Sequence, residues 1–328
     1  MGARGSIGDG LDLKGILYSI MAVALLAPLA LLALYYVQGA GIESRFLVSG
    51  VMGAELANYA DSIRVDFPRA LYVSGYGGTI ACINHVIGSG APADDAALRI
   101  EELAVNGTYM GEQSEIMGGN SSNNTLSGWA DRLQFKGRSY GLQVNVSIVD
   151  YNVTQLDYAN LRFQAVLFVN ALSPAYGAGF SRYYYSEAVV PLAGMEDPLL
   201  PLNSYGLAQR TLSFNSTPLL GTTAFDAAVA AGTCWASSDG PSFLDRLEGS
   251  TSTSTRYAGQ SANVIGFRTI VDLGYLIAQE LPVTLNKTVV DSYYFNTTAP
   301  ASRKVNGSAY WWAYLDDYTA GELGVTLQ

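Results

Sequence analysis

The longest apolar stretch of the chain lies near its N-terminus. The run over 16–37 contains no charged residue and is apolar apart from one serine and three tyrosines. As a helix this run would be about 33 Å long, and the hydrocarbon core of a bilayer is about 30 Å thick. The pattern predicts a transmembrane helix over 15–38 that follows a cytoplasmic tail over 1–14. A cleaved secretory signal is disfavoured because the apolar core is too long.

Acceptor sites for N-glycosylation indicate the orientation of this helix. The pattern Asn-x-Ser/Thr occurs nine times, and every copy follows the apolar run. Sugar is added outside the cytoplasm, so the chain is predicted to be a single-pass protein of the cell membrane, with a cytoplasmic N-terminus and an extracellular ectodomain. The alternative that Asn, Ser and Thr simply share loops stays open. The acceptors are Asn106, Asn120, Asn123, Asn145, Asn152, Asn215, Asn286, Asn296 and Asn306.

The segment after the apolar run keeps a helical pattern. Apolar residues recur at helical spacing over 42–66, which predicts that the helix continues outward as a stalk. Pro68 is expected to end it, because the residue before a proline is disfavoured in the helical region. A second helix is predicted over 69–87, so we interpret 39–90 as a helical stalk or hairpin.

The remaining residues, 91–328, are predicted to form a glycosylated α+β ectodomain. Three segments alternate apolar and polar residues and follow one another through short links, which predicts an antiparallel sheet with one wet face. A polar segment over 105–128 reads as a loop. The strands are expected over 141–149, 160–171 and 182–191, short helices over 94–103, 224–232 and 241–249, and a short helix or turn over 129–140.

The net charge and the cysteine content limit the partners, metal sites and disulfides that can be expected. The net charge of −10 repels phosphate backbones, so no nucleic-acid partner is expected. Two cysteines and one histidine are too few for a zinc site, and no metal site is predicted. In an oxidising exterior, Cys82 and Cys234 are predicted to form one disulfide, with two separately buried thiols as the alternative. No cofactor is expected beyond N-linked glycans.

The catalytic motifs in the chain are incomplete. Gly137 to Gly141 match the G-x-S-x-G pattern with Ser139 as nucleophile, but that motif needs a helix after the serine and a histidine later in the chain. Here a strand is predicted next, and the only histidine, His85, lies upstream on an apolar helix. We therefore interpret Ser139 as part of a turn and His85 as a packed residue. Paired acidic residues are solvated charges or calcium ligands.

Two aromatic segments remain open to two interpretations. The sequences RYYYSE and AYWWAYLDDY place several rings close together. They are expected to pack in the core of strands, while a platform for sugars or a protein partner is the alternative.

Several short segments together resemble a group of archaeal membrane-anchored cell-surface proteins that have no assigned activity. The segments are DLKGILYSIMA, FPRALYVSGYGG, GMEDPLLPLNSYG, PSFLDRLEG, VVDSYYF and YWWAYLDDYTAGELGV. The resemblance implies an archaeal envelope, where N-glycosylation is usual, and it implies no reaction.

The N-terminus also resembles an archaeal class III, or prepilin-type, signal. Leu13, Lys14 and Gly15 stand directly before the apolar run. The resemblance implies cleavage after Gly15 and a helix that becomes a filament core. The sequence departs from the usual pilin pattern, because Ile20 stands where a glutamate is common.

These patterns favour a non-enzymatic structural or adhesion protein of the cell surface, anchored by one N-terminal helix. A pilin-like subunit of an extracellular filament is the first alternative, and a membrane-anchored envelope enzyme is the second. The expected partners are the lipid bilayer and either copies of the chain or other envelope proteins.

Overall fold

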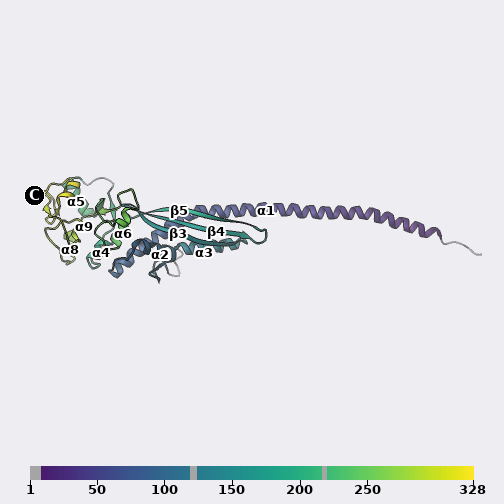
Figure 1. Ribbon diagram of the computed structural model, residues 1–328, viewed down its shortest axis with the longest axis horizontal. Coiled ribbons are helices and arrows are strands. Elements are labelled where there is room, and N and C mark those ends of the chain that lie inside the picture. The colour runs from purple at the N-terminus through teal and green to yellow at the C-terminus, as the bar shows by residue number, and fades with distance from the viewer. Residues whose placement is uncertain (1–8, 119–123, 216–219) are drawn as a thin grey trace, which may run out of the picture.

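The protein is a mixed α and β structure built on one very long helix (Figure 1). The computed structural model describes residues 9–118, 124–215 and 220–328, without the side chains of 9–17, 20 and 38–50. The helices are α1 (Asp9–Ser89), α2 (Ala96–Asn106), α3 (Leu126–Ser139), α4 (Leu199–Asn203), α5 (Thr222–Ala231), α6 (Phe243–Leu247), α7 (Thr255–Ala258), α8 (Leu273–Ala278), α9 (Asp291–Tyr294) and α10 (Asp317–Glu322). The strands are β1 (Thr108–Tyr109), β2 (Glu112–Gln113), β3 (Gln143–Asp157), β4 (Asn160–Ser173), β5 (Ala178–Pro191), β6 (Ser213–Phe214), β7 (Thr233–Ala236), β8 (Phe267–Arg268), β9 (Arg303–Lys304) and β10 (Tyr314–Leu315).

Helix α1 runs unbroken for 81 residues, which is about 120 Å at 1.5 Å per residue. The predicted break at Pro68 is wrong, and so is the predicted hairpin, because both Pro28 and Pro68 lie inside the helix. Pro68 is exposed, whereas Phe67 and Leu71 on either side of it are buried. Packing on the buried side therefore compensates for the backbone hydrogen bond that the proline removes.

In the part of the chain that the structure describes, no helix combines the length and the apolar character that crossing a bilayer requires. The predicted transmembrane helix over 15–38 is therefore not supported. That stretch is instead the first part of α1, which extends away from the rest of the molecule (Figure 1).

The C-terminal half of α1 packs along one stripe. Leu56, Tyr59, Ile63, Phe67 and Leu71 recur every three or four residues, and each is at most 7% exposed. This spacing places them on a single face of the helix, which is the face that meets the sheet and the neighbouring helices.

Two glycines then allow α1 to approach its neighbours closely. A Cβ atom on Gly75 would lie 2.8 Å from the ring of Phe163 in β4. A Cβ atom on Gly78 would lie 2.9 Å from the backbone nitrogen of Ala104 in α2. Real side chains do not pack at such distances, so the two glycines set how closely α1 packs against the sheet and against α2.

The main sheet is the predicted antiparallel meander, in the order β3-β4-β5. All three strands are longer than predicted, and β3 continues past a bulge between Ile148 and Asp150. Alternate residues of β4, such as Phe163 and Leu167, are fully buried on the sheet face that packs against the helices, and the residues between them face outward. Helix α1 covers β4 and β5 on this face, and α2 and α3 cover β3. One face of the sheet therefore belongs to the core, and the other face is open.

The C-terminal part, from about residue 192 onward, is built from short elements at the end of the molecule opposite to the start of α1 (Figure 1). Strand β7 pairs with β6 in parallel and with β8 in antiparallel orientation, and β9 pairs with β10. A second hydrophobic core lies here, around Phe225, Ile270 and Ala313. The short helices predicted over 224–232 and 241–249 correspond to α5 and α6.

A fully buried ion cluster joins the segments of this C-terminal part. Arg246 donates to Asp197 at 2.9 Å and to Asp291 at 2.6 Å, and its guanidinium lies 3.9 Å from the centroid of the Phe267 ring. It also donates to the Phe267 carbonyl oxygen at 2.7 Å. Because both carboxylates are within 2% of complete burial, each charge depends on the others for solvation.

Candidate functional site

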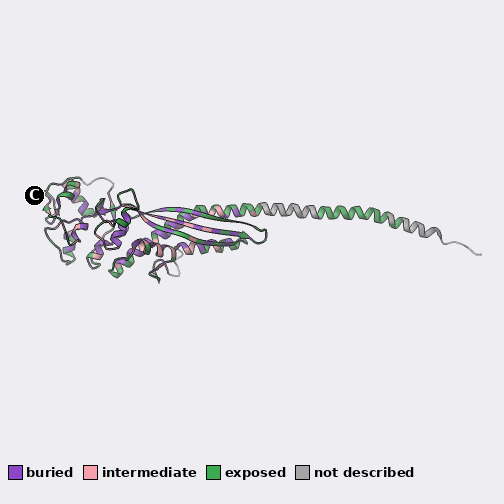
Figure 2. Ribbon diagram, viewed as in Figure 1, coloured by how far each residue is buried: buried purple, intermediate pink, exposed green. Residues whose placement is uncertain are grey.

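The N-terminal half of α1 carries the largest exposed apolar surface among the described residues. Figure 2 shows this stretch as exposed wherever its side chains are described. It contains no carboxylate, lysine, arginine or histidine between residues 18 and 37. Its large apolar side chains are 58–80% exposed, namely Tyr18, Met21, Val23, Leu25, Leu26, Leu29, Leu31, Leu32, Leu34, Tyr35, Tyr36 and Val37.

These side chains point in every direction around the helix. Leu31, Leu32 and Leu34 occupy nearly consecutive positions, so they cannot share one face of a helix with 3.6 residues per turn. A helix that is apolar all round is normally buried on all sides. We therefore call residues 18–37 the projecting apolar segment and treat it as the principal candidate for function.

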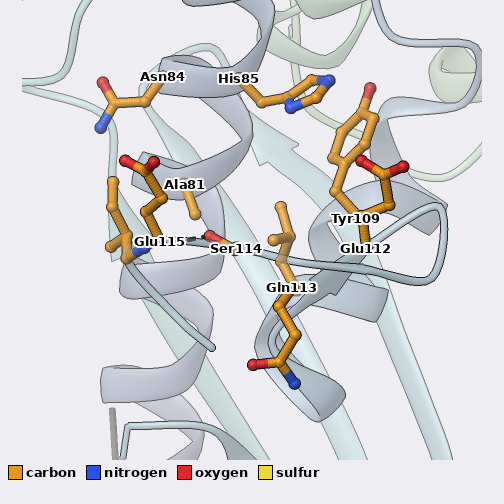
Figure 3. Close-up of a pocket in the computed structure, with 10 residues that line it drawn as sticks. Ala81, Asn84, His85, Tyr109, Glu112, Gln113, Ser114 and Glu115 are labelled. Carbon is orange, nitrogen blue, oxygen red and sulfur yellow. Dashed lines mark hydrogen bonds between the residues drawn. The ribbon is translucent and has the colours of Figure 1, made fainter. Parts of the chain in front are cut away.

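A second candidate is a cavity of about 290 Å³ between α1 and the β1–β2 turn. Figure 3 shows His85 of α1 beside Tyr109, with Glu112, Ser114 and Glu115 around the opening. The rings of His85 and Tyr109 stack with their centroids 3.7 Å apart and their planes 24° apart. Burial raises the pKa of the Tyr109 hydroxyl to about 12, so this hydroxyl stays protonated at neutral pH.

The wall of this cavity is held by hydrogen bonds within the loop. Glu102 of α2 accepts the backbone N–H groups of Met110 and Gly111 and the hydroxyl of Thr108. The Ser114 hydroxyl accepts the N–H groups of Ile116 and Met117, both at 3.3 Å. These polar groups shape the turn. His85 stacks on Tyr109 but is itself exposed, so the interpretation of His85 as a packed residue is wrong.

The structure does not bring Ser139 and His85 together. Ser139 is the last residue of α3 and donates to the Lys136 carbonyl oxygen at 2.6 Å. Lys136 lines a cavity with Tyr59 of α1, and His85 lies 26 residues further along that helix, roughly 39 Å away. A strand, β3, follows Ser139, so the helix that a nucleophile elbow requires is not at this position.

The two cysteines are separate thiols in the structure, and the predicted disulfide is not formed. Cys82 lies in α1 and Cys234 in β7, and both are completely buried. Burial raises the pKa of each thiol to about 12, so both are protonated and weakly reactive. The alternative of two buried thiols therefore describes this structure.

Three of the paired acidic residues, Asp94, Asp95 and Asp316, have structural partners. Asp94 accepts a hydrogen bond from Arg99 at 2.8 Å, and Asp95 caps the N-terminus of α2 by accepting the N–H group of Leu98. Asp316 caps α10 in the same way through Thr319. Among the residues described, no group of three or more His, Cys, Asp or Glu side chains is arranged to hold a metal ion.

Most of the predicted glycosylation acceptors that the structure describes are accessible. Asn120 and Asn123 lie outside the described residues. Asn215 and Asn296 are half-buried. Five acceptors are exposed, namely Asn106, Asn145, Asn152, Asn286 and Asn306.

The predicted aromatic segments divide between core and surface. Tyr184 is 6% exposed, whereas its neighbours Tyr183 and Tyr185 are 65% and 64% exposed. In the C-terminal segment, Trp312 is buried and Trp311 is 59% exposed. Each segment therefore contributes rings to the core and also leaves rings free on the surface.

No family model, no curated protein and no solved structure matches this chain.

Proposed function

We propose that this chain is a non-enzymatic structural protein of the cell surface, and that it assembles into an extracellular filament whose core is formed by the projecting apolar segment. One observation carries the proposal. Residues 18–37 are apolar on every side of a helix that extends away from the folded body, with large side chains at least 58% exposed. Such a surface requires a covering partner.

The energetic argument for a partner is simple. Burying one large aliphatic or aromatic side chain is worth about 1.5–3 kcal/mol. The projecting apolar segment carries a dozen such side chains, so the free energy gained by covering it exceeds the total stability of a typical domain, about 5–15 kcal/mol. A bundle of identical helices covers every side of each helix at once.

The arrangement of the chain suits such a bundle. The folded body lies only at the C-terminal end of α1, so projecting segments can pack side by side while the bodies remain outside (Figure 1). The resemblance of Leu13, Lys14 and Gly15 to a prepilin-type signal supports the same arrangement, because cleavage after Gly15 would make Ile16 the first residue of the apolar helix.

The proposal is tested by N-terminal sequencing of the native protein together with electron microscopy of the same material. We expect fibres whose subunits begin at Ile16. Single spikes on membranes with Met1 retained would contradict the filament and would instead support a surface or adhesion protein anchored singly in the bilayer.

A further inference from the structure

The open face of the main sheet carries a patch of aromatic side chains. Tyr183 and Tyr185 are about two-thirds exposed, and Phe168 and Val166 beside them are half-buried. The ladder places Phe168 opposite Tyr183 and Val166 opposite Tyr185. These four side chains, which we call the aromatic patch, therefore form two adjacent rows across β4 and β5.

The rings of the aromatic patch are held in place. Phe168 and Tyr183 pack with their centroids 4.9 Å apart and their planes inclined at 47°. Gln164 donates to the Tyr185 hydroxyl oxygen at 2.7 Å and to Glu187 at 3.0 Å. A fixed apolar surface of this kind is typical of a binding site, because its side chains lose little freedom on contact.

Two glycosylation acceptors flank the aromatic patch on the third strand of the same face. Asn145 of β3 pairs with Asn170 of β4, one row beyond the Phe168 row. Asn152 pairs with Gln164, one row beyond the Val166 row on the other side. Both asparagines are exposed. On the open face, the row of Phe168 with Tyr183 and the row of Val166 with Tyr185 therefore lie side by side. The row that contains Asn145 lies on one side of them, and the row that contains Asn152 lies on the other.

Distances across the sheet fit a sugar chain that lies flat on this face. Neighbouring strands are about 4.8 Å apart, so β5 lies about 10 Å from β3. The first sugars of an N-linked glycan on Asn145 or Asn152 span that distance. A sugar ring can place its apolar face of C–H groups on an aromatic ring while its hydroxyl groups remain in water. Tyr183 and Tyr185 are exposed enough to accept such a contact.

We infer that glycans attached to Asn145 and Asn152 fold back over the open face of the sheet and stack on Phe168, Tyr183 and Tyr185. A second copy of the chain is a poorer occupant, because bulky sugars on both flanks keep a flat protein surface away. The inference rests on the proposed surface location, where glycosylation takes place. It gives the aromatic patch a specific occupant and makes the glycans part of the folded body.

The test compares the solvent accessibility of the tyrosines with and without these glycans. The native full-length chain, dispersed as monomers in mild detergent, is first mapped by mass spectrometry for glycans on Asn145 and Asn152. Hydroxyl-radical footprinting then measures how fast Tyr183 and Tyr185 are oxidised. We expect both tyrosines to react several-fold faster in the variant with Asn145→Gln and Asn152→Gln than in the native chain.

A matched control removes acceptors elsewhere on the surface. Asn106→Gln with Asn306→Gln also deletes two exposed acceptors and should leave the oxidation of Tyr183 and Tyr185 unchanged. Unoccupied Asn145 and Asn152, or equal oxidation rates with and without them, would overturn the inference. Protection that occurs only in assembled fibres would assign the aromatic patch to a neighbouring copy instead. Filament formation is measured separately, so either proposal can fail while the other stands.

Discussion

The two halves of α1 are one continuous helix with opposite surroundings. The C-terminal half has a buried side, with Ile63 and Leu71 at 0% exposed, and its exposed side mixes charged residues such as Arg64 with scattered apolar ones such as Val65. The N-terminal half is apolar all round, and Leu25 and Leu32 are 64% and 69% exposed.

The two surfaces suit different kinds of contact. The one-sided stripe matches a partner that is already part of the chain, namely the sheet with α2 and α3. The all-round apolar surface matches partners on every side, which the chain alone does not contain. Mutations in the two halves should therefore have separate consequences for assembly and for stability.

Charges in the projecting apolar segment should abolish assembly. In a variant with Leu25→Glu and Leu32→Glu, two carboxylates would have to be buried between helices, which costs several kcal/mol for each ion. We expect complete loss of fibres by sedimentation and electron microscopy, with an unchanged melting temperature of the body. The matched control, Val65→Glu with Val73→Glu, adds the same charges to half-exposed positions of the other half and should still form fibres. Fibres of normal yield from the first variant would contradict this account.

Truncation of the buried stripe should destabilise the body. Phe67 is 1% exposed and stacks on Trp129 with ring centroids 5.7 Å apart. We expect Phe67→Ala to lower the free energy of unfolding by about 3–5 kcal/mol, as measured by urea unfolding of detergent-dispersed monomers. Leu29→Ala, in the projecting apolar segment, should change it by less than about 0.5 kcal/mol. Equal losses from both substitutions would show that the halves are not independent.

Substitution of glycine by alanine should change the stability of the protein in opposite directions at two positions of α1. A Cβ atom on Gly75 would lie 2.8 Å from the Phe163 ring, so Gly75→Ala should cost about 1–3 kcal/mol. A Cβ atom on Gly53 would meet nothing within 4 Å, so Gly53→Ala should stabilise the helix by about 0.5–1 kcal/mol. Thermal unfolding of the two variants checks both signs, and a stabilising Gly75→Ala would refute the close contact with the sheet.

A small effect of pH on stability should also distinguish the folded body from the projecting apolar segment. Burial raises the pKa of the Glu102 carboxyl, but hydrogen bonds from the Gly111 and Met110 N–H groups, the Thr108 hydroxyl and Arg99 outweigh it, and the net pKa is lowered. A lowered pKa in the folded state means that the stabilisation is present above the usual range of a glutamate and is lost as the pH falls through the folded value.

The contribution of Glu102 to the stability of the body should therefore be lost in acid, and Glu102→Gln should remove that part of the pH dependence. Assembly should show no matching step, because residues 18–37 contain no group that titrates in acid. Melting temperatures and fibre yields measured across the acid range give both curves. A fibre yield that falls in acid while the melting temperature of the body stays constant would contradict this prediction.

Local pattern was enough to predict the sheet and much of the helical content. Alternation in β3, β4 and β5 identifies these strands because one face is buried, as Val144, Leu167 and Val190 show. Pro68 was misleading, because tertiary packing by Phe67 and Leu71 on the buried side of α1 outweighs the local preference against a helix at proline.

The pattern of neighbouring residues could not predict the contacts between segments that are far apart in the sequence. Arg246 bonds to Asp197 and Asp291, which lie 49 and 45 positions away along the chain, and none of the three has a spacing that signals a neighbour. The separation of Cys82 from Cys234 likewise depends on how α1 and β7 pack, which the spacing of two cysteines does not reveal. The flanking of the aromatic patch by Asn145 and Asn152 depends on strand register, which the bulge in β3 shifts.

In the proposed filament, other copies of the chain cover the projecting apolar segment of each subunit. The most direct test is a helical reconstruction by electron cryomicroscopy of the native assembly, at a resolution that traces α1. We expect residues 18–37 of neighbouring copies to contact one another in a central bundle, with the sheet and the C-terminal part outside. A map in which these residues are surrounded by lipid around a single copy, or are open to solvent, would contradict the account.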